Sequence, residues 1–164
     1  MTVRLSGRVP NTIADGPGLR YAVYAQGCNL FCQGCHNPGT HDIDGGEEIS
    51  VDLIASEMAA DPLLDGLTLT GGEPFLQAEP LTVLAQAARA LGLNVWIYSG
   101  YTYEQIIQDD AKRVLLQQAD VLVDGPFVLA QRSLGTDWRG SKNQRILDVK
   151  ASMAAGEAVG YGGV

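Results

Sequence analysis

Four short apolar runs recur along the chain, and each ends at a turn that contains glycine. The stretches between them have the spacing of helices, so the pattern predicts repeated strand and helix units and an α/β fold. The run at 93–98 is apolar on both alternating faces, as expected of a central strand in a sheet covered by helices. A further strand is expected within 138–149. The four runs are 19–24, 66–70, 93–98 and 119–125.

Helix signals lie between these runs. Ser50 can cap a helix that begins at the next residue. A second helix has Pro80 at a favourable first position and Gly92 at its C-terminal end. The stretch 103–118 predicts a helix with a break near Asp109. The apolar face expected for the second helix comprises Leu81, Leu84, Ala88 and Leu91.

Residues capable of chemistry follow the carboxyl ends of the predicted strands. They are the segment 28–35, the "GGEP" turn at 71–74, Ser99 and Asp124. In parallel α/β sheets and barrels this edge carries the active site. A complete eight-stranded barrel takes about 250 residues, whereas this chain has 164. We therefore expect an incomplete, TIM-like β/α barrel that is open on one side.

Composition indicates one domain over residues 1–164, because 46% of the residues are hydrophobic. The last part, 151–164, is small and glycine-rich, and we expect a loosely ordered tail there. No apolar stretch approaches the roughly 20 residues of a membrane span, and the N-terminus lacks the apolar core of a secretory signal. We expect a cytoplasmic protein with no membrane partner. The net charge of −8 also argues against nucleic acid as a partner.

The chain has three cysteines, Cys28, Cys32 and Cys35, and all three fall in one short loop. Cytosolic thiols stay reduced, so a tight cluster of them more often binds metal than forms disulfides. A four-iron cluster needs four ligands, and three cysteines would leave one iron without a protein thiol. Such an open position can bind a small molecule, much as a catalytic zinc keeps one position free.

Other metal sites fit part of this loop. The "CQGCH" segment matches a haem-attachment pattern through Cys32, Cys35 and His36, but it would leave Cys28 unused. A structural zinc bound by the three cysteines and either His36 or His41 is also compatible with the spacing. The cysteine spacing alone leaves these alternatives open.

The cysteine pattern CxxxCxxC, followed further along the chain by "GGEP" at 71–74, resembles the radical S-adenosylmethionine enzymes. The resemblance covers nearly the whole chain. It implies a [4Fe-4S] cluster held by Cys28, Cys32 and Cys35, with S-adenosylmethionine chelating the fourth iron through its amino and carboxylate groups. It further implies an oxidoreductase that cleaves this cofactor reductively to methionine and a 5'-deoxyadenosyl radical, on a partial barrel of the same type.

Four further segments are similar to the small activating enzymes of glycyl-radical proteins, in particular the activators of anaerobic ribonucleoside-triphosphate reductases. The most discriminating is "RGS", one variable residue and then "NQ". Gly34 stands where the wider superfamily has an aromatic residue, and the small reductase activators commonly have glycine there. The segments are "DGPGLR", "CHNPGTHD", "ADVLVDGPF" and "WRGSKNQRILDV".

The resemblance implies a set of cofactor-binding residues around the cluster. Gly71 and Gly72 would let backbone carbonyls approach the cofactor's ammonium group without a Cβ in the way, and Glu73 would add negative charge near it. Ser99 and Asp124 could contact the ribose or an ion, or could be ordinary turn residues. The full set is Gly34, Cys35, His36, Gly71, Gly72, Glu73, Ser99 and Asp124.

The implied substrate is the backbone glycine of a large reductase subunit, offered on a loop that enters the open side of the barrel. Asp15 and Gly16 would meet this partner, although their segment could simply form a tight turn. Arg139 and Lys142 could pair with an acidic patch on it, or form a solvated basic edge. A flavodoxin-type protein is the expected electron donor.

Three alternative functions remain open at this level. The chain could activate another glycyl-radical enzyme, or it could act on a small molecule by the same radical chemistry. In a different class, it could be a zinc- or cluster-binding module without catalysis. Metal analysis separates the last possibility from the first two.

Overall fold

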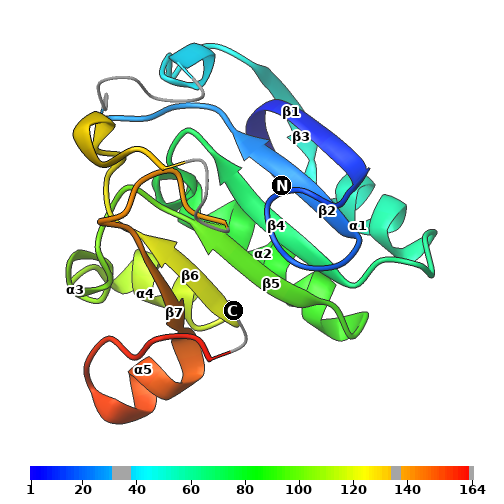
Figure 1. Cartoon of the computed structure of the whole chain (residues 1–164). Helices are drawn as coiled ribbons and strands as arrows, with labels where there is room; N and C mark the ends of the chain where they lie inside the picture. Colours follow the sequence, from blue (N-terminus) through cyan, green and yellow to red (C-terminus); the bar gives the residue numbers. More distant parts are fainter. Residues whose placement is uncertain (31–37, 134–137, 163–164) are drawn as a thin grey trace.

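A computed structural model describes residues 1–30, 38–133 and 138–162. Within them, seven strands form one sheet in the order β3-β1-β2-β4-β5-β6-β7 (Figure 1). The four central strands run parallel to one another, and antiparallel strands flank them on both edges. The strands are β1 (Thr2–Thr12), β2 (Arg20–Ala25), β3 (Glu47–Ser50), β4 (Gly66–Gly71), β5 (Asn94–Tyr98), β6 (Val121–Asp124) and β7 (Arg145–Asp148).

This mixed α/β sheet contains every strand that the hydrophobic pattern predicts. The pattern gave no indication of β1 or β3, which pair antiparallel at one edge of the sheet. Only Val3 and Leu5 of β1 are buried in the core, while most of its second half is exposed. The second half of β1 is exposed to water at the edge of the sheet. The strand therefore lacks the continuous apolar run that marks a central strand.

Five α-helices and three short 3-10 helices complete the described part of the chain. Ser50 caps α1 by accepting a hydrogen bond from the Leu53 amide, as predicted. Asp109 caps α4, so the expected break in 103–118 separates α3 from α4. None of the described helices is long and apolar enough to cross a membrane. The helices are α1 (Val51–Ala59), α2 (Ala78–Ala90), α3 (Tyr103–Ile106), α4 (Asp110–Leu116), α5 (Val149–Ala155), η1 (Pro38–Thr40), η2 (Pro74–Gln77) and η3 (Leu129–Gln131).

Two details of α2 differ from the sequence prediction. The helix begins at Ala78, directly after η2, so Pro80 is its third residue. Leu91 lies just beyond the helix and is 44% exposed, while the rest of the predicted apolar face is buried. Gly92 has a φ of 80° after the helix, the left-handed conformation expected at this end.

The two faces of the sheet differ in chemistry because side chains alternate along each strand. One face packs against α1, α2 and α4 (Figure 1) and supplies the main hydrophobic core. The other face, called here the polar face, contains threonines, tyrosines and a tryptophan. This face includes Tyr24, Thr68, Thr70, Trp96 and Tyr98.

The segment after β7 is better ordered than its composition predicts. Residues Val149–Ala155 form α5, and Ser152 is fully buried. Beyond the helix, Gly160 pairs with Leu147 of β7, and the Tyr161 ring packs edge-on against Trp96 at 5.7 Å. The segment up to Tyr161 therefore differs from the loose tail that composition predicts, because it adds backbone hydrogen bonds to the outer side of β7.

Candidate active site

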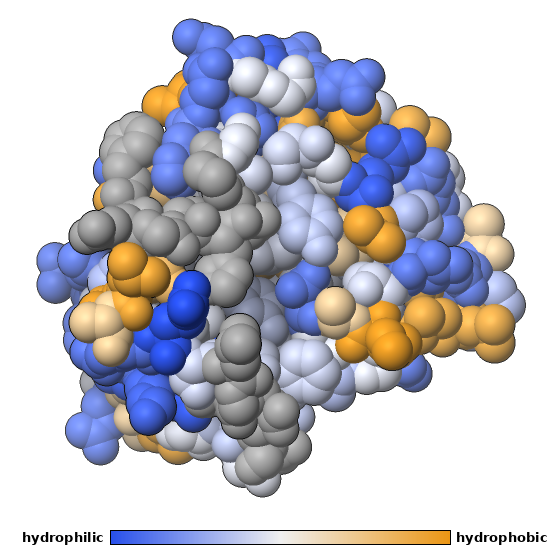
Figure 2. Space-filling view, turned by 45° about the horizontal axis from the view of Figure 1, so that its top comes forward, coloured by the Kyte–Doolittle hydropathy of each residue, from blue (hydrophilic) through white to orange (hydrophobic). Residues whose placement is uncertain are grey.

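A cavity of about 440 Å³ opens at the carboxyl ends of β2, β4, β5 and β6. Mostly hydrophilic and neutral residues surround the hollow on this face of the molecule (Figure 2). Its volume falls within the range of small-molecule and cofactor sites. The cavity lies at the sheet edge where the sequence predicts the site.

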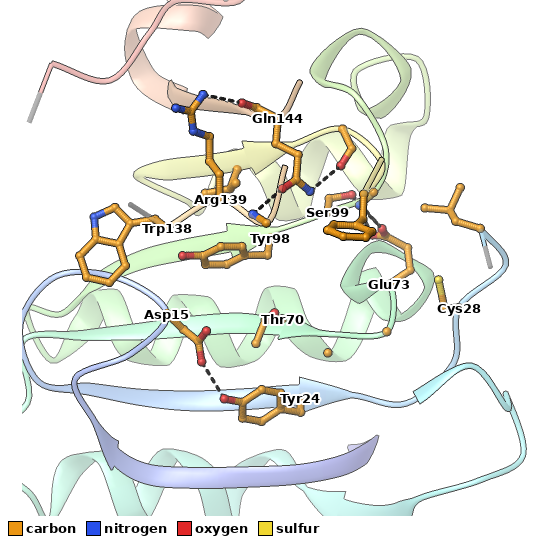
Figure 3. A pocket seen from close by; sticks show the side chains of 18 of the residues that line it. Asp15, Tyr24, Cys28, Thr70, Glu73, Tyr98, Ser99, Trp138, Arg139 and Gln144 are labelled. Atoms are coloured by element: carbon orange, nitrogen blue, oxygen red, sulfur yellow. Dashed lines mark hydrogen bonds between the residues drawn. The ribbon is translucent and has the colours of Figure 1, made fainter. Parts of the chain in front are cut away.

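One end of the cavity contains Cys28, which follows β2 (Figure 3). Its side chain is buried, and its amide donates a hydrogen bond to the His41 carbonyl at 3.2 Å. Four predicted site residues, Cys32, Gly34, Cys35 and His36, lie outside the described residues. Among the residues described, no group of three His, Cys, Asp or Glu side chains could hold a metal ion.

The Gly71–Gly72 turn packs backbone against backbone on the segment that leads to Cys28. Gly71 has a φ of 101°, and a Cβ on Gly72 would lie 2.3 Å from the Gly27 carbonyl oxygen. The Glu73 amide donates to that same oxygen at 2.8 Å. Glycine is therefore required at these positions, because any side chain would push the turn away from Cys28.

Glu73 lines the cavity but is 0% exposed, and protein donors engage both of its oxygens. Oε1 accepts from the Gly100 amide at 2.7 Å, Oε2 accepts from the Phe75 amide at 3.1 Å, and the Ser99 hydroxyl lies 2.9 Å from each oxygen. Burial raises the pKa of Glu73 to about 7, although the Gly100 and Phe75 amides and the Ser99 hydroxyl oppose the rise. In the described structure, Glu73 and Ser99 thus form hydrogen bonds that connect the turn after β4 to the turn after β5.

Among the described residues, Asp124 is the predicted cofactor-binding residue that does not line the cavity. Its carboxylate is 1% exposed and accepts from Arg145 Nε at 2.9 Å and from the Tyr103 amide at 2.7 Å. Arg145 also contacts Glu104 at 2.7 Å. These contacts make Asp124 an anchor between β6, β7 and α3.

The "DGPGLR" segment is held by a buried arginine. Arg20 is fully buried and donates to Thr68 Oγ1 at 2.7 Å and to the Pro17 carbonyl at 2.9 Å. Thr68 Oγ1 in turn donates to the Asp15 carbonyl at 2.7 Å. A Cβ on Gly16 would lie 2.8 Å from Arg20 Nε, so this glycine leaves room for the guanidinium. Arg20 and Thr68 therefore hold the loop through the carbonyl groups of Asp15 and Pro17.

Asp15 reaches the cavity as a result of this arrangement. It has a φ of 61°, and its Oδ2 accepts a hydrogen bond from the Tyr24 hydroxyl at 2.6 Å (Figure 3). Gly16, the other predicted partner-binding residue of this loop, is buried against Arg20 and does not line the cavity.

The "RGSKNQ" segment forms a clasp, residues 139–144, above the cavity. The Gln144 side chain accepts from the Gly140 amide at 2.8 Å and donates to the Gly125 carbonyl at 3.0 Å. Arg139 lines the cavity, and its Nη1 donates to the Gln144 carbonyl at 3.0 Å. Lys142 is exposed and lies outside the cavity lining. The motif thus joins the segment after β6 to the segment before β7.

Several cavity residues were not predicted, among them Tyr24, Thr70, Tyr98 and Trp138. Three of them lie on the polar face of the sheet. The sequence contains a signal for that face, because Thr68 and Thr70 alternate with buried leucines in β4. This alternation becomes visible only when the two faces of each strand are considered separately.

Comparisons with known proteins agree with the site. A family model described as a 4Fe-4S single cluster domain matches residues 14–147, which include the three cysteines and every residue lining the cavity. The chain is 34% identical over 145 residues to the anaerobic ribonucleoside-triphosphate reductase-activating protein of Vibrio cholerae, covering 84% of this chain and 92% of that protein.

Two further relatives bear the same name. The protein from Haemophilus influenzae is 31% identical over 147 residues, covering 84% of this chain and 92% of its own. The protein from enterobacteria phage T4 is 32% identical over 146 residues, covering 84% of this chain and 88% of its own.

Proposed function

Because this chain belongs to the 4Fe-4S single cluster domain family of radical S-adenosylmethionine activating enzymes, we propose that it activates an anaerobic ribonucleoside-triphosphate reductase by generating a glycyl radical on it. The observation that carries the proposal is the cavity that brings Cys28 next to the Gly71–Gly72 turn. The name shared by the relatives supplies the identity of the reductase.

Cys28, Cys32 and Cys35 are the proposed ligands of the [4Fe-4S] cluster. Thiolates are the ligands that such clusters use, and these are the three cysteines of the sequence. When bound, the reduced cluster would supply the electron for reductive cleavage of S-adenosylmethionine, and the cleaved cofactor would supply the radical chemistry that takes a Cα hydrogen atom from the partner's glycine. Gly34, Cys35 and His36 are proposed to face the cofactor from the same loop.

The residues of the cavity suit a charged, elongated cofactor. The Gly71–Gly72 turn is without side chains where it borders the cavity, so its backbone can approach a ligand closely. Glu73 braces this turn against Ser99 and Gly100, and its buried charge would favour a neighbouring ammonium group. In this proposal Glu73 and Ser99 position the turn, and Asp124 supports the site from a distance.

We also propose that the sheet is the wall of an incomplete, TIM-like barrel in a single domain over residues 1–164. The support is the arrangement of the two faces: helices cover one, and the polar face of the parallel strands lines the cavity, as the inside of a barrel would. The antiparallel strands β1, β3 and β7 at the edges depart from a regular barrel.

The partner assignments follow from the same proposal. The substrate is the glycine-bearing segment of the large reductase subunit, and a flavodoxin-type protein is the proposed electron donor in the cytoplasm. Asp15 and Arg139 line the cavity and are proposed to meet the substrate segment. Gly16 and Lys142 lie outside the lining, so Gly16 would act through the loop that it shares with Asp15.

The test is an anaerobic reconstitution with iron and sulfide. The reduced protein should release 5'-deoxyadenosine from S-adenosylmethionine, and addition of the reductase subunit should give the paramagnetic resonance doublet of a glycyl radical. An intact four-iron cluster without cofactor cleavage would refute the activating function. Bound zinc without iron would instead indicate a structural metal module.

A further inference from the structure

The segment that follows α5 lies outside residues 14–147, which the family model matches. The chain turns back after α5 and returns beside β7 (Figure 1). The Asp148 amide donates to the Val159 carbonyl at 2.9 Å. The Tyr161 amide donates to the Ile146 carbonyl, also at 2.9 Å. These backbone bonds attach the returning segment to the sheet and fix the position of Tyr161.

Tyr161 packs against Trp96, a residue in the middle of β5 that is 2% exposed. The two rings meet edge-on, with 5.7 Å between their centres and 81° between their planes. Trp138 makes a similar contact with Trp96 at 6.1 Å. Edge-on aromatic pairs stabilise a structure beyond the area that they bury. The orientation of the Trp96 ring is therefore set by two aromatic neighbours.

The Trp96 ring supports a buried charge. The Arg20 guanidinium lies over this ring, 5.7 Å from its centre. Arg20 is fully buried, and none of the ion pairs within the described part of the chain includes it. Burial lowers the pKa of Arg20 to about 10, so the side chain still carries its charge at neutral pH. A buried cation without a carboxylate beside it depends on the dipoles and ring faces around it, so the contact with Trp96 carries more weight here than at the surface.

Arg20 in turn holds the loop before β2, residues 13–19. Its guanidinium donates to the Pro17 carbonyl at 2.9 Å and to Thr68 Oγ1 at 2.7 Å. Thr68 Oγ1 donates to the Asp15 carbonyl at 2.7 Å. A shift of the guanidinium would weaken both of these anchors of the loop. A continuous series of contacts therefore runs from Tyr161 through Trp96 and Arg20 to this loop.

We propose that Tyr161 is a positioning residue for loop 13–19, so that the segment after α5 helps to place Asp15 at the cavity. Tyr161 does not line the cavity, and it acts through Trp96 and Arg20. The effect on catalysis rests on the proposed function, in which Asp15 meets the partner's segment. The effect on the loop is independent of that function, because every contact in the series lies within this chain.

Hydrogen–deuterium exchange of the reconstituted full chain, before S-adenosylmethionine or reductase is added, tests the effect on the loop. In Tyr161→Ala the amides of 13–19 should exchange roughly 3- to 10-fold faster, the change expected when one aromatic pair is lost. Tyr161→Phe keeps the ring and should exchange like the wild type. Tyr161→Leu keeps apolar bulk without a ring and should behave like Tyr161→Ala, with a smaller change in packing.

Met153→Ala is the matched control. Met153 lies in α5, within the same C-terminal part of the chain, but it packs against the main core and contacts the Tyr103 hydroxyl. It should leave the exchange of 13–19 unchanged. In glycyl-radical formation, Tyr161→Ala should raise the KM for the reductase subunit roughly 3- to 10-fold. Its kcat, and its cleavage of S-adenosylmethionine without the reductase, should stay as in the wild type, which a general loss of stability would not allow.

Unchanged exchange of 13–19 in Tyr161→Ala and Tyr161→Leu would overturn the inference. An equal increase in Met153→Ala would do the same, because it would indicate loosening of the whole C-terminal part. Exchange in Tyr161→Phe as fast as in Tyr161→Ala would assign the effect to the hydroxyl and exclude the ring contact. Faster exchange with an unchanged KM would refute the role in catalysis. A wild type that forms no glycyl radical would refute the proposed function and would leave the exchange result standing.

Discussion

The carboxylate of Glu73 and the backbone amide of Gly100 lie 2.7 Å apart, and this hydrogen bond ties the turn after β4 to the turn after β5. The Ser99 hydroxyl adds a second contact between the same two turns. Both turns border the cavity. One buried side chain therefore sets the relative position of two neighbouring parts of the site.

The first prediction concerns pH. The pKa of Glu73 is about 7 in the folded protein and ordinarily 4.5, so between these values the folded state binds more protons than the unfolded state. Its contribution to stability is therefore present at low pH and is lost as pH rises through this window. Relative to Glu73→Gln, the wild type should lose up to about 3 kcal/mol between about pH 5 and pH 8.

Thermal unfolding of both proteins at several pH values measures this effect. The variant does not titrate at this position, so other groups cancel in the difference between the two curves. A difference that stays constant across the window would contradict the raised pKa. Glu73→Gln should also be less stable at low pH, because its amide cannot accept from both the Gly100 and Phe75 amides.

The second prediction concerns the close packing of the "GGEP" turn. In Gly72→Ala the new Cβ would meet the Gly27 carbonyl oxygen at 2.3 Å, which should cost about 1–3 kcal/mol in unfolding free energy. Gly7→Ala is the control, since nothing lies within 4 Å of a Cβ there. Urea unfolding measures both variants. Equal midpoints for the two would contradict the close approach at Gly72.

The third prediction separates the two partners of a buried ion pair. Arg145→Met leaves the Asp124 carboxylate, which is 1% exposed, without its cation and should cost about 3–5 kcal/mol. Asp124→Asn should cost less, because Arg145 keeps Glu104 and its side chain is 40% exposed to water. Chemical denaturation ranks the two variants, and the reverse order would exclude this explanation.

The fourth prediction tests the support beneath the "DGPGLR" loop. Thr68→Val removes the hydroxyl that links Arg20 to the Asp15 carbonyl and should cost about 1–3 kcal/mol. It should also weaken glycyl-radical formation more than cofactor cleavage, because Asp15 loses its position. In the control Thr82→Val, the lost hydroxyl bonds only within a helix, to Ala78. Similar stability losses for both variants would argue against the link.

The fifth prediction concerns the cluster ligands. Cys32→Ala should abolish the four-iron cluster, because the sequence contains no replacement thiol. Cys28→Ala and Cys35→Ala should behave in the same way, with no 5'-deoxyadenosine formed. Iron and sulfide analysis after anaerobic reconstitution provides the measurement. A full cluster in any of the three variants would remove that cysteine from the ligand set.

Much of the parallel sheet could be predicted because its strands are short, largely buried segments rich in apolar residues and each ends at a glycine-containing turn. The helix starts at Ser50 and Asp109 were predictable for a local reason, since a capping side chain bonds to backbone only three residues away. The outer strands β1 and β3 were not, because an edge strand is partly solvated and its partner is distant in sequence.

The candidate site was predictable as a location but not in its contacts. Strand ends placed Cys28, Gly72 and Ser99 at one edge, and all three line the cavity. Asp124 lies at the equivalent end of β6, but its carboxylate accepts a hydrogen bond from Arg145 of β7 and does not line the cavity. No local sequence pattern predicts this ion pair, because Asp124 and Arg145 meet only through the antiparallel register of β6 and β7.

The hydrogen-bonded clasp at 139–144 affects how strongly a partner protein can bind at the cavity. Gln144 and Asn143 fasten it to the chain that follows β6, through the Gly125 and Pro126 carbonyls. A rim that is fixed before an encounter loses little conformational freedom during it, so more of the contact energy remains as affinity. The reductase would then dock onto a mouth that already has its final shape.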